Sequence, residues 1–270
     1  MNRIDAAFNE LNENGRKGLF PFIVAGHPDL ETTIRLIARF QELGASGIEV
    51  GFPFTDPVAD GPVIQTAFNH ALDAGVTVEK IFDAFGKARD RIRIPLLAMV
   101  SVSIVFRIGV DAFLDRAGEA GFSGLIIPDL SLEEAATVKE KAEARDLRLA
   151  MLVSPTSPTG RQDRIAKTAS GFIYYMSVAG VTGERTKLPP ELADNVRRLK
   201  DVSGMPVLVG FGIKDPDQVR QVCSVADGAI VGSAFVRRIT DAVAAGAPSE
   251  HVVDQLSLYL NDLLSGLPDA

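Results

Sequence analysis

Two acidic residues eleven positions apart could divide the work of a general acid and a general base. Glu49 lies inside the apolar run G-I-E-V-G-F, which predicts a buried strand, and alternation places its side chain on the face shared by Gly47 and Gly51. Two glycines on that face would leave room for a ligand beside the carboxylate. Asp60 follows in P-F-T-D-P-V-A-D-G-P, whose prolines and glycine predict a loop directly after the strand. Carboxylates in different surroundings at one strand end can take opposite roles in proton transfer.

Burial would give Glu49 the property that proton transfer requires. A carboxylate without a partner in an apolar setting is costly unless it takes up a proton, so its pKa is expected to rise. A buried ion pair is the structural alternative, but the predicted strands hold few basic residues, with Arg148 at the start of one. Asp60 has its own alternative, as the N-cap of a helix beginning near Gly61. Asp56, in the same loop, is a further carboxylate at this strand end.

Glycine-bearing turns follow the last three predicted strands. Their sequences are S-V-A-G-V-T-G, G-F-G-I and G-S-A. Barrels commonly hold a phosphate between such late loops and a helix N-terminus, where glycine lets backbone N–H groups approach the ligand. The residues expected to hold a phosphate are Gly183, Gly212, Gly232 and Ser233. The polar loop at 182–190 is either a mobile lid over this site or an ordinary exposed loop.

These positions come together if the chain alternates between short strands and longer helices. Apolar, β-branched runs alternate with amphipathic segments, which predicts parallel strands joined by crossover helices. The strands are predicted at residues 19–25, 47–52, 94–100, 124–128, 148–154, 172–178, 206–212 and 229–232. Their apolar character indicates burial on both faces, and eight units without an edge strand favour a closed (β/α)8 TIM barrel. We expect a single barrel domain over residues 1–270, with extra helices at the N-terminus, at 78–91 and at 250–264.

Composition and charge exclude several classes of protein. The chain has 270 residues, of which 46% are hydrophobic, and a TIM barrel needs about 250. The net charge of −7 argues against a nucleic acid or an anionic membrane as the main partner. No apolar stretch is long enough to span a bilayer, and the N-terminus lacks the apolar core of a signal peptide. The single cysteine, Cys223, allows no intrachain disulfide, which fits a cytoplasmic enzyme, and no cluster with metal-ligand spacing is found.

The run G-I-E-V-G-F-P-F-T-D-P-V-A-D-G-P-V-I-Q closely resembles the signature of the tryptophan synthase alpha chain family. The resemblance covers nearly the whole length, through P-F-I-V-A-G-H-P, G-L-I-I-P-D-L, G-V-T-G and G-F-G-I. It implies a TIM-barrel lyase that cleaves indole-3-glycerol phosphate into indole and glyceraldehyde 3-phosphate by a retro-aldol reaction. It also implies a beta-chain partner in an α2β2 hetero-tetramer, with pyridoxal phosphate in the beta chain and no cofactor in this chain.

The resemblance further implies roles for individual residues. Glu49 matches the family's catalytic glutamate, and Asp60 matches the catalytic aspartate that pairs with the indole N–H. Thr182 matches the loop threonine that positions this aspartate when the loop closes. The walls of the indole pocket correspond to Phe22, Tyr174 and Phe211, and the phosphate cradle corresponds to Gly183, Gly212, Gly232 and Ser233.

Three features depart from the family pattern outside the expected proton-transfer pair. The run A-M-V-S-V-S-I-V-F after the third predicted strand lacks the usual Tyr and Asn, Val178 stands where Arg is common, and His27 replaces an acidic residue. The first departure lies near the family's contact with its beta chain, so docking of that partner is left open. Position alone would allow His27 to act as a base, but we expect it to have a turn or loop role.

Two other functions fit the same fold. A phosphosugar isomerase can be built on such a barrel, but it needs a more polar lining than Phe22, Tyr174 and Phe211 provide. An interaction subunit with little catalysis would explain the altered run after the third strand. It would not explain why Glu49 and Asp60 are both intact.

Overall fold

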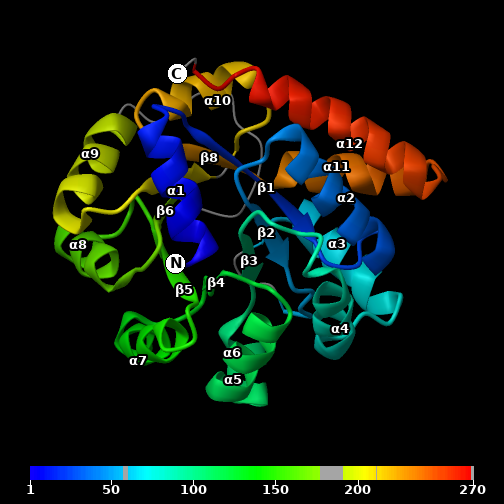
Figure 1. Ribbon diagram of the computed structural model, residues 1–270, viewed down its shortest axis with the longest axis horizontal. Coiled ribbons are helices and arrows are strands. Elements are labelled where there is room, and N and C mark those ends of the chain that lie inside the picture. Colours follow the sequence, from blue (N-terminus) through cyan, green and yellow to red (C-terminus); the bar gives the residue numbers. More distant parts are fainter. Residues whose placement is uncertain (57–59, 177–190, 211, 269–270) are drawn as a thin grey trace.

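Eight parallel strands close into a barrel in the order of the sequence (Figure 1). The computed structural model describes residues 1–56, 60–176, 191–210 and 212–268. The strands are β1 (Gly18–Val24), β2 (Ile48–Gly51), β3 (Leu96–Met99), β4 (Gly124–Ile126), β5 (Arg148–Val153), β6 (Ile173–Met176), β7 (Val207–Gly210) and β8 (Gly228–Val231). Each strand pairs with the next, and β1 pairs with β8 to close the ring. The predicted (β/α)8 barrel is therefore confirmed.

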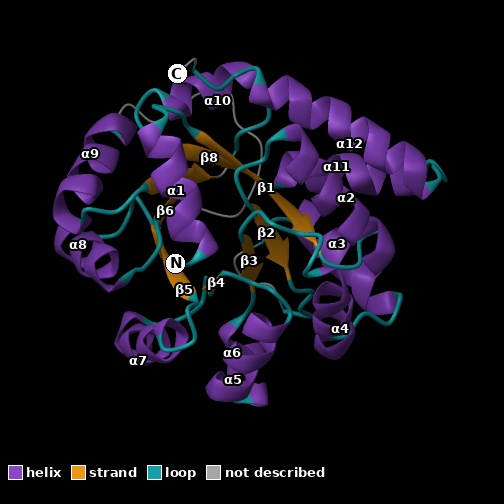
Figure 2. Ribbon diagram, in the orientation of Figure 1, coloured by secondary structure: helices purple, strands orange, loops and turns teal. Residues whose placement is uncertain are grey.

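Helices surround this barrel (Figure 2). The helices between strands are α2 (Leu30–Leu43), α3 (Pro62–Asp73), α4 (Val78–Ala88), α5 (Val102–Ile108), α6 (Val110–Glu119), α7 (Leu132–Glu143), α8 (Thr159–Thr168), α9 (Leu192–Ser203) and α10 (Pro216–Cys223). The helix α1 (Arg3–Glu13) precedes β1, while α11 (Ser233–Ala244) and α12 (Ser249–Leu264) follow β8. The predicted extra helices are thus α1, α4 and α12. None of the helices described combines the length and apolarity that a membrane span requires.

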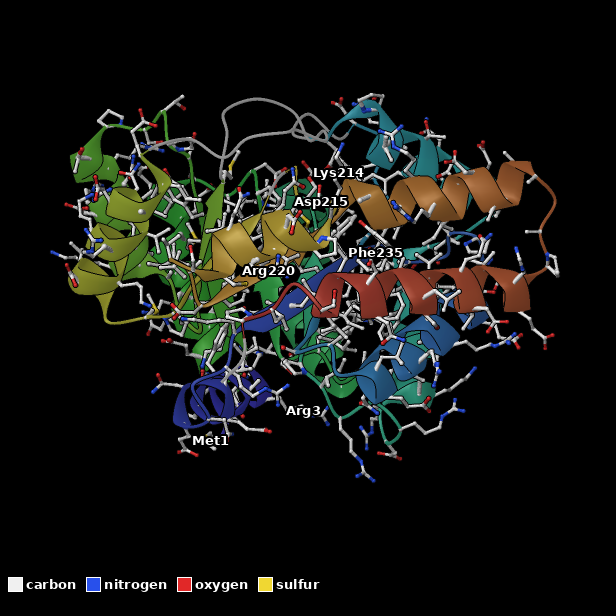
Figure 3. All side chains as sticks on the ribbon, turned by 90° about the horizontal axis from the view of Figure 1, so that it is seen from above. Met1, Arg3, Lys214, Asp215, Arg220 and Phe235 are labelled. Atoms are coloured by element: carbon white, nitrogen blue, oxygen red, sulfur yellow. The ribbon has the colours of Figure 1, made fainter. Side chains whose placement is uncertain are left out.

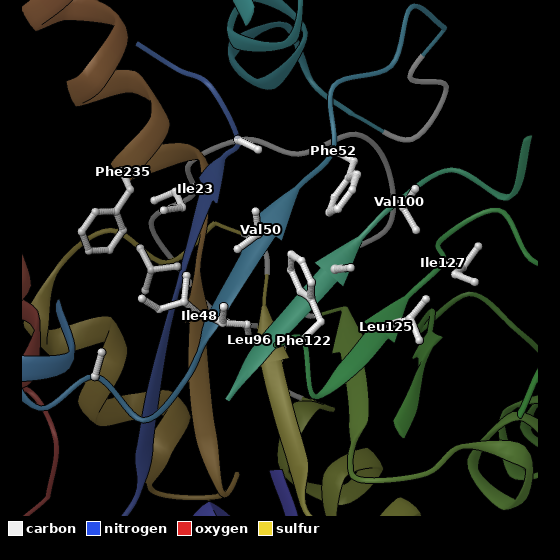
Figure 4. Packing of buried hydrophobic residues seen from close by; sticks show 14 of the residues in the cluster. Ile23, Ile48, Val50, Phe52, Leu96, Val100, Phe122, Leu125, Ile127 and Phe235 are labelled. Carbon is white, nitrogen blue, oxygen red and sulfur yellow. The ribbon is translucent and has the colours of Figure 1, made fainter. Parts of the chain in front are cut away.

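Side chains on the strands alternate between the barrel interior and the layer beneath the helices. Ile48 and Val50 of β2 belong to the large apolar cluster that the strands share with the helices, as does Leu125 of β4 (Figure 4). A separate cluster fills the interior with residues such as Phe20 and Leu97. Because Ile48 and Val50 face the helices, the side chain between them, that of Glu49, faces the interior.

The N-terminal helix α1 closes one end of the barrel. The ring of Phe8 stacks on that of Phe20, with centroids 5.8 Å apart. An ion pair holds the helix in place, since Arg148 Nη2 lies 2.6 Å from Asp5 Oδ2. Figure 3 shows Met1 and Arg3 of this region on the opposite side of the molecule from Lys214 and Asp215, which follow β7. The carboxyl ends of the strands, where barrel enzymes place their chemistry, therefore lie at the end away from α1.

Candidate active site

A pocket at the carboxyl ends of the strands gathers side chains from most of the barrel. Its lining residues are Phe22, Glu49, Asp60, Ile64, Met99, Tyr174, Gly212, Gly232 and Ser233. Seven of the ten residues predicted from the sequence to form a site are in this set. The other three, Thr182, Gly183 and Phe211, lie outside the described residues.

Glu49 is the buried carboxyl group of this pocket. Its residue is 1% exposed, and neither of its carboxyl oxygens has a hydrogen-bond partner within the described part of the chain. Burial raises its pKa well above the usual value, because the charged form loses hydration and gains no counterion in return. The alternative of a buried ion pair is not seen among the described residues, since both carboxyl oxygens lack a partner there and Arg148 pairs with Asp5 and Asp146. Burial therefore favours the protonated form of the Glu49 carboxyl group.

The glycines on either side of Glu49 have a different role from the predicted one. We expected Gly47 and Gly51 to leave room for a ligand. A Cβ atom on Gly47 would lie 2.5 Å from Phe20 Cε1, and one on Gly51 would lie 2.6 Å from Phe22 Cζ. The space is thus taken by two rings of the neighbouring strand β1. The prediction of room for a ligand was wrong because the sequence of β2 does not show which side chains of β1 pack against it.

Asp60 enters the pocket from the loop that precedes α3. The N-cap of α3 is Gly61, which makes no side-chain cap, so the interpretation of Asp60 as a mere N-cap is wrong. The backbone carbonyl of Asp60 accepts a hydrogen bond of 2.8 Å from Gln65 Nε2, which ties the residue to the first turn of the helix. Burial, and secondarily the charge of Asp129, raise the pKa of Asp60 to about 6. At neutral pH Asp60 is therefore largely ionised, whereas burial favours the protonated form of Glu49 in the same pocket.

Tyr174 on β6 faces the same two carboxyl groups. Its residue is 5% exposed, and burial raises its pKa well above the usual value, with the charges of Glu49 and Asp60 adding to the shift. The phenol therefore stays protonated throughout the ordinary pH range. Together with Phe22, it gives the pocket aromatic walls on β1 and β6.

The other side of the pocket is suited to an anion. Helix α11 begins at Ser233, and no side chain caps its N-terminus, so backbone N–H groups of its first turn remain available to a ligand. The three atoms nearest to a Cβ atom on Gly232 would all belong to Phe22, the closest at 3.6 Å, which is ordinary van der Waals distance. Packing of the protein therefore does not require glycine at position 232, and the space that a side chain would occupy is part of the pocket. Gly212 takes a left-handed conformation with φ of +87°, which favours glycine after β7.

Two residues that line the pocket were not predicted from the sequence. Ile64 lies on the first turn of α3 and Met99 ends β3, and both look like ordinary apolar core positions in the sequence. The sequence did hold a signal for each: Ile64 is close to Asp60 along the chain, and Met99 is at the carboxyl end of a predicted strand. They add to the apolar part of the lining, which suits a planar apolar group more than a sugar chain.

A second cavity, of about 190 Å³, adjoins the first and shares Asp60 and Met99 with it. It includes Asp56 and Asp129, so Asp56 belongs to this neighbouring space and not to the pocket that holds Glu49. Asp129 is fixed by the N-terminus of α5: its carboxylate accepts hydrogen bonds of 2.7 Å from Ser101 Oγ and 2.8 Å from the backbone N–H of Val102. The unusual run after the third strand thus contributes a serine that anchors a carboxylate near Asp60.

The three histidines and the cysteine lie outside the pocket. His27 is buried in the loop after β1, which agrees with the expected loop role, while His70 lies on α3 and His251 on α12. Cys223 is buried, and burial raises the pKa of its thiol to about 12. Among the described residues, no three His, Cys, Asp or Glu side chains are grouped so that they could hold a metal ion.

Fold and site together define a class of protein. It is a barrel with a pocket at the carboxyl ends of its strands, and the lining is suited to acid–base chemistry on a substrate that has an apolar group at one end and an anionic group at the other. A family model for the tryptophan synthase alpha chain matches residues 8–264. The chain belongs to the tryptophan synthase alpha chain family.

Individual relatives agree with this assignment. A tryptophan synthase alpha chain of Rhodopirellula baltica is 44% identical over 246 residues, which cover 90% of this chain and 88% of the relative. One of Synechococcus sp. (strain CC9902) is 46% identical over 236 residues, covering 87% and 88%. The crystal structure of tryptophan synthase subunit alpha from Legionella pneumophila superposes with a TM-score of 0.88 at 35% identity, covering 98% of both chains. The chain is therefore a lyase of tryptophan biosynthesis that cleaves indole-3-glycerol phosphate into indole and glyceraldehyde 3-phosphate.

Proposed function

We propose that Glu49 and Asp60 carry out this cleavage in the pocket they share. The observation that carries the proposal is the position of Glu49, a buried carboxyl group without a partner among the described residues, in the same pocket as an ionised aspartate and a helix N-terminus. The indole ring would lie between Phe22 and Tyr174, with Ile64 and Met99 completing the apolar lining. The phosphate would lie at Gly212, Gly232 and Ser233, and we assign Thr182, Gly183 and Phe211 to the same site by their match to the family motifs.

The proton transfers follow from the two ionisation states. Protonated Glu49 donates its proton to C3 of the indole, which leaves positive charge on N1 that the carboxylate of Asp60 stabilises. The bond between C3 and the side-chain carbon then breaks, and its electron pair restores the aromatic ring. The hydroxyl on that carbon becomes an aldehyde and returns its proton to the Glu49 carboxylate, so no net proton is consumed. No cofactor is needed in this chain.

The partner and the cellular location are further parts of the proposal. Membership in the alpha chain family supports a beta-chain partner, in an α2β2 hetero-tetramer whose beta chain binds pyridoxal phosphate. Phe106 on α5, which is 44% exposed, is an apolar side chain available for such a contact. A negative net charge and a single buried cysteine support a cytoplasmic enzyme. We further propose that residues 1–270 form one domain.

The two alternative functions fit the pocket less well. A phosphosugar isomerase binds an open-chain polyol, whose hydroxyl groups would face Phe22, Ile64 and Met99 without hydrogen-bond partners from them. A non-catalytic interaction subunit would have no use for a costly buried carboxyl group at Glu49. The lyase reaction uses both the apolar lining, which would bind the indole ring, and the buried carboxyl group of Glu49, which would transfer the proton.

Replacement of Glu49 tests the assignment. Glu49→Gln keeps the shape of the side chain and removes its ability to exchange a proton, so indole release from indole-3-glycerol phosphate should fall by roughly a hundredfold or more. Asp56→Asn is the matched control, since that carboxylate lies in the adjoining cavity and should leave proton transfer intact. Both variants are assayed with and without a beta chain. Near-normal turnover by the Glu49→Gln enzyme would remove Glu49 from the mechanism.

A further inference from the structure

A buried histidine connects the two helices that begin at the active site. His27, in the loop between β1 and α2, is 1% exposed. Its Nε2 atom lies 3.0 Å from Thr240 Oγ1 on α11. Its ring meets that of His70 on α3 edge-on, with centroids 4.8 Å apart and an interplanar angle of 74°. One side chain therefore contacts both α3 and α11, which also pack directly against each other.

The hydrogen bonds around Thr240 determine which nitrogen of His27 carries the proton. The hydroxyl of Thr240 donates to the carbonyl oxygen of Val236, at 3.0 Å. A hydroxyl has one hydrogen, so towards His27 it acts as an acceptor, and His27 Nε2 must be the donor. The imidazole is thus the tautomer with its hydrogen on Nε2, and this hydrogen forms the link to α11.

The ring of His27 is uncharged at neutral pH. The Nδ1 atoms of His27 and His70 are both buried and have no hydrogen-bond partner within the described residues. Burial and the neighbouring His70 lower the pKa of His27 to about 4. The carboxylate in the same loop, that of Asp29, is engaged by the backbone N–H and hydroxyl of Thr32, at 2.7 Å each. A positive charge would be unfavourable at this position, so the contact is made by an uncharged ring.

The location of this contact relates it to the reaction. Helix α3 begins at Pro62, two residues after Asp60, and α11 begins at Ser233. His70 and Thr240 lie eight and seven residues further along these helices, or about 10–12 Å from their beginnings at 1.5 Å per residue. The two helices carry the carboxylate at one end of the pocket and the anion site at the other. Fixing one helix against the other therefore fixes the distance between these two ends.

We propose that His27 is a positioning residue for the lyase reaction. Its neutral ring holds α3 against α11 and so keeps Asp60 at the correct distance from the backbone groups of Gly232 and Ser233. The inference rests on the proposed roles of these three residues. The chemical step would depend on Asp60, a single group on a single loop, whereas binding of the phosphate would be shared by the loops after β7 and β8. Loosening the connection should therefore lower kcat more than it raises KM.

Two pairs of variants separate the hydrogen bond from simple packing. Thr240→Val removes the acceptor and keeps the shape, whereas Thr240→Ser keeps the hydroxyl. His27→Asn places its amide near the position of Nδ1, whereas His27→Gln can reach the position of Nε2 and donate to Thr240. His251→Ala, at an exposed histidine of α12, is the control. Thr240→Val and His27→Asn should lower kcat by roughly tenfold, since small displacements of reacting groups have effects of this order or larger. Thr240→Ser, His27→Gln and His251→Ala should stay within about twofold of the wild-type enzyme.

Amide hydrogen exchange in the absence of substrate provides the second measurement. In the full chain, Thr240→Val and His27→Asn should speed exchange in the first turns of both α3 and α11. Unchanged exchange in both variants would overturn the connection. Faster exchange with unchanged kcat would overturn the positioning role and leave His27 as a purely structural residue. If the proposed function itself is wrong, Asp60→Asn should turn over at the normal rate, whatever the exchange rates of the other variants. That result differs from both outcomes that would overturn the role of His27.

Discussion

Phe22 and Glu49 stand opposite each other in the β1–β2 ladder, so adjacent strands present a phenyl ring and a carboxyl group to one pocket. Gly51, on the same face as Glu49, makes room for the ring. Phe22 is 4% exposed and Glu49 is 1% exposed, so the pair is almost free of contact with water. One packing arrangement therefore provides an apolar wall and, through desolvation, raises the pKa of the acid beside it.

Gly51→Ala tests this arrangement. The new Cβ atom would lie 2.6 Å from Phe22 Cζ, so the ring must move away from β2. Overpacking of this kind costs about 1–3 kcal/mol of stability. Displacement of the ring should raise the KM for indole-3-glycerol phosphate about fivefold, in line with the loss of one aromatic contact. Steady-state kinetics on folded enzyme measures this change, and Gly160→Ala, in open space on α8, is the control. An unchanged KM would show that Phe22 does not form a wall for the substrate.

The pH dependence of kcat/KM should report the ionisation of Asp60. This carboxylate must be charged to stabilise N1 of the indole, and its pKa in the free enzyme is raised to about 6. The charged fraction falls as the pH drops below that value, so kcat/KM should fall on the acid side, with its midpoint near pH 6. The carboxyl and phenol groups that face Asp60 from the two cavities are Glu49, Asp56, Asp129 and Tyr174. Of these, Asp129 raises the pKa of Asp60.

Asp129→Asn should therefore move the acid limb of the profile to lower pH, because it removes a negative charge that opposes ionisation of Asp60. The substitution also changes the bonds to α5, so Ser101→Ala is measured in parallel. That variant loses one hydrogen bond to Asp129 and keeps the charge, so its acid limb should stay in place. A limb that moves equally in both variants would assign the effect to the position of α5 and not to charge.

Much of the barrel could be predicted from local patterns. Apolar runs and the periodicity between them place the strands, and Asp29 and Gly44 mark the two ends of α2 through interactions with their own helix. The inward direction of Glu49 follows from the period of two along β2. These features depend on residues close together in the sequence, which is why the sequence alone predicts them.

Features that depend on distant residues could not be predicted. Nothing in β2 indicates that Phe20 and Phe22 of another strand occupy the space above Gly47 and Gly51. Ile64 and Met99 have the residue types of a core, and only the closed barrel turns them toward the pocket. The bond between His27 and Thr240 joins residues 213 positions apart, so it becomes visible only when β1 and α11 are placed in space.

Gly232→Ala should separate the phosphate site from the stability of the fold. The added methyl group would meet Phe22 at 3.6 Å, an ordinary contact, so the barrel can accept it. The melting temperature should change by no more than about 4 °C, which corresponds to about 1 kcal/mol in a protein of this size. The same methyl group would occupy the space proposed for the phosphate and should raise the KM about tenfold, the effect of losing one hydrogen bond to a charged group. Inhibition by inorganic phosphate should weaken in parallel, whereas Gly118→Ala, in open space on α6, should change neither quantity. If KM and phosphate inhibition both stay at their wild-type values, the phosphate does not lie against the beginning of α11.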